Sequence, residues 1–220
     1  MRVLTWNLFH GRSVPGAGHE LLDAFAAALA GWPWDVALLQ EVPPWWPAPL
    51  GRACGATARS VLTSRNELPA VRRALARRVP DLVKSNGGGC NAILVRGETV
   101  LEHRRARLRR LPERRLVHGV RLVDGAWYAN LHGQVRPPTA ARADLSAAAA
   151  YALEWAGTAP LVLGGDLNLP RPGVDGLDVL GGHGVDHVLG RGVRSPGARR
   201  VLDRGRLSDH APVLVGVERA

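Results

Sequence analysis

The chain has 220 residues, two cysteines and a formal net charge of +10. A chain of this length can bury a core large enough to fold without disulfide bonds, and two cysteines outside a CxxC pair exclude a disulfide framework. The first residues lead directly into a strand pattern, and no apolar run is as long as a membrane span, so we expect neither a signal peptide nor a transmembrane helix. We expect one domain over residues 1–220 and, with reduced thiols, a cytoplasmic location.

The positive charge comes almost entirely from arginine, because Lys84 is the one lysine of the sequence. A basic balance favours polyanionic partners such as nucleic acid or phosphorylated substrates. Charge that serves solubility alone is an equally good explanation. The charge by itself therefore does not choose between these two interpretations.

The first half of the chain alternates strand and helix patterns. Short apolar runs bounded by polar residues indicate buried strands. Residues 20–31 carry apolar side chains at helical spacing and end at Gly31, which indicates a helix packed on a core. We predict strands over residues 2–8, 35–41 and 91–97, helices over residues 20–31, 43–55 and 68–80, and a turn over residues 86–90.

An arginine-rich segment opens the second half of the chain. It runs from Glu102 to Arg121 and is interrupted at Pro112, so it predicts a strand, a turn and a second strand. An alanine-rich helix is predicted over residues 139–157, and further strands over residues 126–133, 160–166, 184–190 and 211–218. Strands that alternate with helices in some places and form hairpins in others indicate an α/β (α+β) fold, with two mixed sheets packed face to face and helices outside.

Polar residues end or closely follow these predicted strands. Taken singly, such a residue is usually a turn former. Taken together, they supply carboxamides, carboxylates and imidazoles, a set that suits hydrolysis of a phosphate ester with a divalent metal ion. The residues are Asn7, Gln40, Glu41, Asn130, His132, Asp166, Asn168, Asp186, His187, Ser208, Asp209 and His210.

Asp166 and Asn168 follow the apolar run of the segment "LVLGGDLNLP" and lie two residues apart. In an extended segment this spacing directs both side chains to one side, toward one phosphate group. Gly164 and Gly165 stand just before them and would permit close approach of the backbone.

The order of six short motifs resembles the endonuclease/exonuclease/phosphatase superfamily, which includes pancreatic-type deoxyribonuclease, abasic-site endonucleases, sphingomyelinases and inositol-polyphosphate phosphatases. The resemblance implies a four-layer α/β sandwich, in which two packed mixed sheets are flanked by helices and the site lies at one edge. The motifs are "TWNL", "LLQEV", "NLHG", "GGDLN", "VDHVL" and "LSDHAPV".

The resemblance implies a metal site made by Glu41, Asn7 and Asp209. Glu41 matches the carboxylate that binds the metal, Asn7 the amide beside it, and Asp209 a second carboxylate on the metal side. Magnesium prefers oxygen ligands and keeps several waters, so one or two carboxylates suffice. We therefore expect Mg²⁺ as the cofactor, with Mn²⁺ as the alternative.

The resemblance also implies the catalytic residues. Asp166 would orient or deprotonate the attacking water, and Asn168 would hold the phosphate. His210 would lie near the scissile phosphate with Asp186 orienting its ring, and His132 matches the second histidine of deoxyribonuclease-like members. A carboxylate behind an imidazole fixes its tautomer and favours its protonated form.

Substrate-binding candidates are Arg107 and Arg109 in the arginine-rich segment, Trp45 beyond Glu41, and Asn91 as a polar partner for His132. The alternative for the two arginines is a solvated hairpin face. The alternative for Trp45 is packing of a proline-rich loop, and the alternative for Asn91 is a turn residue. The leading hypothesis is a metal-dependent phosphodiesterase acting on DNA or RNA. A phosphatase or phosphodiesterase of a small or lipid phosphate is the alternative, and a catalytically silent nucleic-acid-binding protein is the third. No obligate protein partner is evident.

Overall fold

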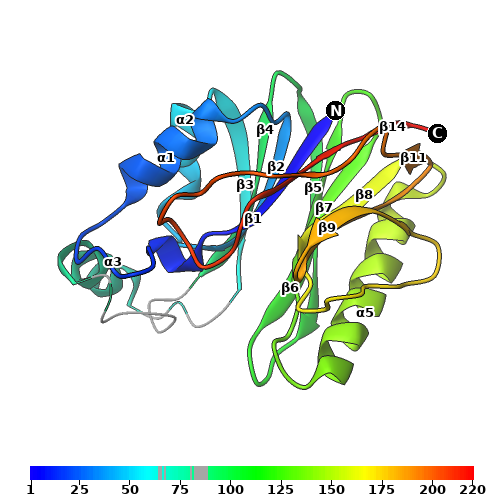
Figure 1. The fold of residues 1–220 in the computed structure, drawn as a ribbon. Helices are drawn as coiled ribbons and strands as arrows, with labels where there is room; N and C mark the ends of the chain where they lie inside the picture. Colours follow the sequence, from blue (N-terminus) through cyan, green and yellow to red (C-terminus); the bar gives the residue numbers. More distant parts are fainter. Residues whose placement is uncertain (64–65, 67, 80, 82–88) are drawn as a thin grey trace.

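The computed structural model describes residues 1–63, 66, 68–79, 81 and 89–220. Its strands form two six-stranded sheets that pack against each other, and helices cover the outer faces (Figure 1). Each sheet combines parallel with antiparallel pairing. The predicted α/β sandwich of two mixed sheets flanked by helices is confirmed.

The first sheet is formed by strands from the beginning of the chain and by two short strands near its end. Helices α1 (Leu22–Gly31) and α2 (Pro47–Ala53) cover its outer face, a single 3₁₀ turn η1 (Phe9–Gly11) follows its first strand, and α3 (Pro69–Arg78) follows β3 (Figure 1). In sheet order, the strands are β12 (Arg200–Val201), β13 (Val213–Gly216), β1 (Arg2–Asn7), β2 (Val36–Val42), β4 (Cys90–Arg96) and β3 (Ala56–Leu62).

The second sheet is formed by the middle of the chain. The long helix α5 (Pro138–Ala156) lies along its outer face (Figure 1). In sheet order, the strands are β5 (Val100–Arg109), β6 (Arg115–Leu122), β7 (Trp127–His132), β8 (Leu161–Asp166), β10 (Asp186–Arg191) and β9 (Asp178–His183). A separate two-stranded sheet pairs β11 (Val193–Arg194) with β14 (Glu218–Arg219).

Three apolar layers hold these elements together. One lies between the first sheet and α1 with α2, and includes Trp6 and Phe25, whose ring centroids are 5.0 Å apart. A second lies between the second sheet and α5. The third lies between the sheets, where Leu38 of β2 and Val188 of β10 are fully buried. Burying apolar surface on both faces of each sheet drives this layered packing.

The layer between the sheets becomes polar toward one end. Gln40 continues the inward face of β2, and its Nε2 donates to Asn130 Oδ1 of β7 at 2.8 Å. Asn130 Nδ2 in turn donates to the carbonyl oxygens of Leu39 and Ala92, each at 2.9 Å. Buried polar groups need such partners. These bonds tie the two sheets together just beneath the ends of β1, β2, β7 and β8.

The interior strands and the helices lie where the sequence predicts them, but the sequence pattern does not predict β3 and β9. Both are edge strands, and most of their residues are partly or fully exposed. A strand with so few fully buried residues lacks the apolar run that indicates a buried strand. The predicted turn at residues 86–90 falls largely outside the described residues. Among the described residues, no helix has the length and apolar character needed to span a membrane.

Candidate active site

Polar side chains gather at one end of the two sheets. The parallel pairs β1–β2 and β7–β8 bring their carboxyl ends to this edge, while β10 and β13, antiparallel to β8 and β1, bring their amino ends to it. These ends surround a pocket of about 320 Å³. Its lining residues are Asn7, Phe9, His10, Arg12, Glu41, His132, Val135, Asp166, Asn168, Asp209 and His210.

Asp166, at the end of β8, lies at the centre of this group. Its Oδ2 accepts a hydrogen bond of 2.9 Å from Asn7 Nδ2, and its Oδ1 accepts the backbone N–H of Asn168 at 3.1 Å. His132 Nε2 and His210 Nε2 lie 3.5 Å and 3.8 Å from Oδ2. Burial and the nearby Asp186 raise the pKa of Asp166 to about 6, although His210 and Asn7 oppose the shift. The carboxylate therefore has a basicity suited to accepting a proton near neutral pH.

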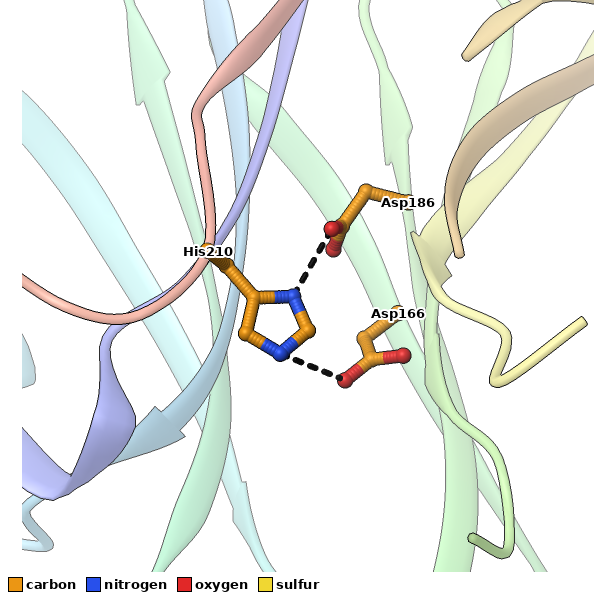
Figure 2. Close-up of side chains that lie close together, drawn as sticks. All are labelled: Asp166, Asp186 and His210. Atoms are coloured by element: carbon orange, nitrogen blue, oxygen red, sulfur yellow. Dashed lines mark hydrogen bonds and ion pairs between the residues drawn. The ribbon is translucent and has the colours of Figure 1, made fainter. Parts of the chain in front are cut away.

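His210 lies between two carboxylates, one facing each ring nitrogen (Figure 2). Its Nδ1 is 2.8 Å from Asp186 Oδ2, and its Nε2 faces Asp166. Burial lowers the pKa of His210, but the hydrogen bond to Asp186 and the surrounding carboxylates outweigh it and raise the pKa to about 9. Burial raises the pKa of Asp186, and its bond to His210 opposes this shift.

The loop before β13 holds His210 in place through Ser208. The Ser208 hydroxyl donates to the backbone oxygen of Asn7 at 2.6 Å and accepts the backbone N–H of His210 at 3.0 Å. The Trp6 indole donates to the backbone oxygen of His210 at 3.0 Å. These bonds fix the loop to the end of β1, so His210 from one sheet meets Asp186 from the other.

Glu41, at the end of β2, faces two imidazoles. Its Oε2 is 3.0 Å from His10 Nε2, and its Oε1 is 3.7 Å from His132 Nε2. Burial raises the pKa of Glu41, but the contacts with His10 and His132 and a bond from Asn7 outweigh burial and hold this pKa far below its usual value. Burial and the nearby Arg115 hold the pKa of His132 well below its usual value, although Glu41 opposes this.

Left-handed backbone conformations concentrate at the pocket. Glu41 has a φ of 50° at a bulge in β2, which redirects its side chain from the strand alternation. Asn168 has a φ of 53° and Ser208 a φ of 62°, and Phe9 and His10 of η1 are also left-handed. Such conformations cost free energy outside glycine and cluster at functional sites. Their concentration here indicates backbone arranged around a function.

The glycines before Asp166 allow β8 to approach its neighbours. Gly165 has a φ of 144°, and a Cβ atom there would overlap the carbonyl oxygen of Leu131. A Cβ atom on Gly164 would lie 2.9 Å from the Leu38 side chain. The close approach at these two glycines is to β7 and to the facing sheet, and it sets the position of Asp166.

Two groups of side chains offer ligand atoms for a cation. One ligand atom from each of Asp166, Asp186 and His210 lies within 4.8 Å of the others, but His210 Nδ1 is already engaged by Asp186. Glu41 and Asp209 also line the pocket and supply carboxylate oxygens, the donors that Mg²⁺ prefers. The donor chemistry of the pocket fits a divalent cation.

Eight of the predicted site residues come together here. Asn7, Glu41, His132, Asp166, Asn168, Asp209 and His210 line the pocket, and Asp186 contacts His210 from behind. The four predicted substrate-binding residues, Trp45, Asn91, Arg107 and Arg109, do not line it.

The arginines lie on β5, at the edge of the second sheet. Arg109 is bound to Asp144 of α5 at 3.0 Å, which neutralises it on the helix side of the sheet. Arg107 has neither a hydrogen bond nor an ion pair among the described residues, and it is exposed. Neither arginine lines the pocket, although β5 ends on the same side of the sheet as β7.

Trp45 is partly buried and Asn91 is fully buried. Trp45 packs against the layer beneath α1 and α2 and donates to Glu20, and the neighbouring Trp46 is only 2% exposed. Burial favours packing as the role of this loop. Asn91 is fully buried on β4, and neither atom of its amide has a partner among the described residues.

Four lining residues were not predicted: Phe9, His10, Arg12 and Val135. Three of them lie in or beside η1, between the strand predicted over residues 2–8 and the helix predicted over residues 20–31. The Arg12 guanidinium stacks on the Phe9 ring, 3.8 Å from its centroid. An imidazole three residues after the strand-end Asn7 was the signal in the sequence that could have identified His10.

The chain was compared with known protein sequences, solved structures and protein families. Curated protein sequences gave no match. Similar solved structures include a functionally unknown conserved protein from Enterococcus faecalis, with 16% identity, a TM-score of 0.73 and coverage of 100% of both chains. A mannosyl-6-phosphatase from Bacteroides thetaiotaomicron has 15% identity, a TM-score of 0.72 and 99% coverage of each chain.

A truncated TDP2 from Caenorhabditis elegans has 17% identity and a TM-score of 0.68, with coverage of 100% of this chain and 97% of that one. At these identities the likeness concerns the fold. The sequence itself matches the Endonuclease/Exonuclease/phosphatase family over residues 4–210, which includes every residue of the pocket. The chain belongs to the Endonuclease/Exonuclease/phosphatase family.

Proposed function

We propose that this chain is a divalent-metal-dependent phosphodiesterase that acts on DNA or RNA. Family membership supports phosphoester hydrolysis. The observation that carries the proposal is the setting of Asp166, whose Oδ2 is bound by Asn7 and lies within 3.8 Å of the Nε2 atoms of His132 and His210. A carboxylate held in this way can orient a water molecule and accept its proton.

His210 and Asp186 act together in this proposal. Asp186 orients the ring through the 2.8 Å contact at Nδ1, which leaves Nε2 directed into the pocket. From there Nε2 binds a phosphate oxygen and stabilises the charge that develops on it. Asn168 lines the same pocket, although its Nδ2 donates to the backbone oxygen of Gly133 at 3.1 Å before substrate binds.

Glu41, Asn7 and Asp209 would hold the metal ion. The two carboxylates supply negative charge, and the side chain of Asp209 is 45% exposed, so it can turn toward a ligand. When bound, a divalent ion polarises the phosphoryl oxygen and stabilises a leaving alkoxide. Mg²⁺ is the proposed ion, with Mn²⁺ as its alternative.

The net charge of +10 and the partly exposed Arg12 at the pocket support a polyanionic substrate. Arg12 is held by stacking on Phe9, so its guanidinium is positioned to meet a phosphate beside the scissile one. A small phosphate ester is the second candidate. The compact pocket and the likeness to a mannosyl-6-phosphatase favour it. The proposal includes a cytoplasmic location, supported by two free, buried cysteines.

One assay tests these alternatives together. The protein is incubated with plasmid DNA, RNA, a sugar phosphate, phosphoinositides and sphingomyelin, each with Mg²⁺ or with EDTA. Cleavage of DNA or RNA that requires Mg²⁺ is the expected result. Asp166→Asn is the matched control, because it keeps the shape of the side chain and should abolish cleavage, whereas the activity of a contaminating nuclease would persist. Binding of nucleic acid without cleavage would identify a catalytically silent protein.

A further inference from the structure

His10 is a pocket residue that has no part in the mechanism above. It lies in η1, three residues after Asn7, and its side chain is 13% exposed. Its Nε2 is 3.0 Å from Glu41 Oε2. Its Nδ1 is buried and has no partner among the described residues, so Glu41 is the group that engages the ring. The chain therefore places an imidazole directly against its proposed metal-binding carboxylate.

The backbone that carries His10 is held firmly. Phe9 and His10 have φ values of 49° and 54°, and the Phe9 N–H donates to Asn7 Oδ1 at 2.9 Å. Gly11, with a φ of 76°, packs so closely on the Trp46 ring that a Cβ atom there would overlap it. Two consecutive left-handed residues outside glycine cost on the order of 1–3 kcal/mol each and persist only where the surroundings impose them.

The spacing of the two side chains suits a shared cation. Two ligand atoms bound at right angles, each at about 2.1 Å from a metal ion, lie about 3.0 Å apart. The distance from His10 Nε2 to Glu41 Oε2 has this value. Mg²⁺ favours oxygen donors alone, whereas imidazole nitrogen favours later first-row transition metals.

We propose that His10 is a direct ligand of the cation at Glu41, so that the pocket binds a first-row transition metal by nitrogen and oxygen atoms more tightly than it binds Mg²⁺, which remains the ion proposed for catalysis. The inference rests on the proposed function only in that it uses the same metal position. A residue that merely orients Glu41 would give no metal–nitrogen bond and would favour no class of metal.

Pulsed electron paramagnetic resonance of the protein with bound Mn²⁺ tests the nitrogen bond directly. We expect modulation from a histidine ¹⁴N nucleus in the wild type, its disappearance in His10→Asn, and its persistence in His132→Asn. Asparagine is chosen because it tolerates left-handed φ values. The result for the wild type does not depend on the folding of any variant, and thermal unfolding checks that both variants are folded.

Calorimetry with Co²⁺ and with Mg²⁺ tests the preference. His10→Asn should weaken Co²⁺ binding at least about tenfold, at the low end of the effects seen when a metal site is perturbed, and should weaken Mg²⁺ binding less. A wild type without ¹⁴N modulation, modulation that survives in His10→Asn, or equal weakening for both metals would each overturn the inference. These outcomes are distinct from failure of the proposed function, in which the metal binds through His10 but no phosphate ester is cleaved.

Discussion

The strand-end pocket and the β5–β6 hairpin both contain dense charge, but they use it in opposite ways. In the pocket, residues far apart in the sequence contact one another, as Asn7 and Asp166 do across 159 positions. In the hairpin, two of the four ion pairs made with described residues join residues only two positions apart. Glu102 pairs with both Arg104 and Arg121, the first only two positions away.

The difference teaches which sequence signal is informative. A run of arginines extends along one sheet edge, where each side chain finds its own partner or faces solvent. Strand ends converge on one edge because the sheet topology brings them there. Short polar motifs spread over the whole chain therefore indicate a site better than one segment of high charge does.

The largest expected effect tests whether residues from the two sheets act together in the pocket. His210→Ala should lower the single-turnover rate on the best substrate by about 10²–10⁴, which corresponds to about 2.7–5.5 kcal/mol. Asp186→Asn should cost less because the ring remains, and the double variant should be little worse than His210→Ala alone.

His187 is the matched control for this pair. It follows Asp186 in the sequence, but its Nε2 contacts the backbone oxygen of Gly184 at 3.1 Å, outside the pocket. His187→Ala should leave the rate nearly unchanged. Additive effects in the double variant would show that Asp186 and His210 do not act as a unit.

The second effect concerns the backbone that delivers Asp166. Gly165→Ala should destabilise the protein by about 2–4 kcal/mol, because it adds strain at a positive φ and an overlap with the Leu131 carbonyl. Chemical denaturation measures the change. Gly173→Ala is the control, since a Cβ atom there meets no atom within 4 Å. Equal stability of the two variants would contradict the role given to Gly165.

A third prediction compares carboxylates in the two regions. Glu41→Gln should weaken divalent-metal binding by about 10- to 100-fold, because the amide keeps the shape of the side chain but removes its charge. Glu102→Gln on the hairpin should not alter metal affinity, since its carboxylate is engaged by two arginines. Titration calorimetry measures both. Unchanged affinity in Glu41→Gln would remove this residue from the metal site.

The smallest effect on catalysis is expected from the unpaired arginines of the hairpin. Arg105, Arg107 and Arg110 have neither a hydrogen bond nor an ion pair among the described residues. Replacing all three with serine should leave hydrolysis of a small phosphodiester unchanged. If the hairpin binds duplex DNA, a plot of the logarithm of affinity against the logarithm of salt concentration should become less steep. Its slope should decrease in magnitude by roughly 0.9 for each DNA phosphate that the variant no longer neutralises.

The matched control is replacement of Arg104 and Arg121, which Glu102 neutralises. This pair should change the salt dependence less than the unpaired set does. An unaltered dependence in the triple variant would leave the hairpin as a solvated face, the alternative raised by the sequence.

Sequence patterns anticipated the parts of the fold that bury apolar surface. The run "VALLQE" predicts β2 because both faces of that strand are covered. The edge strand β3 has alternating exposure along much of its length, and no apolar run distinguishes it from a loop. Edge strands are fixed by pairing with a neighbour, which the local sequence does not reveal.

The site was predictable where a motif marks a strand end, and less so where the backbone leaves regular geometry. Asp166 and Asp186 could be named from the chain alone. The left-handed turn at His10, the bulge at Glu41 and the tether from Ser208 depend on contacts with distant segments. A loop conformation imposed by tertiary contacts leaves little trace in the residues that adopt it.

The bond between Gln40 and Asn130 has a consequence for catalytic alignment. Asn7, Glu41 and His210 are attached to one sheet, and His132, Asp166 and Asp186 to the other. Among the described strands, no backbone ladder joins the two sheets, so side-chain packing and side-chain hydrogen bonds such as this one determine how the two halves of the site line up. A displacement of about 1 Å between reacting groups can cost about 10²-fold in rate. Substitutions deep in the interior, remote from any phosphate, can therefore change the catalytic rate by displacing one half of the catalytic centre relative to the other.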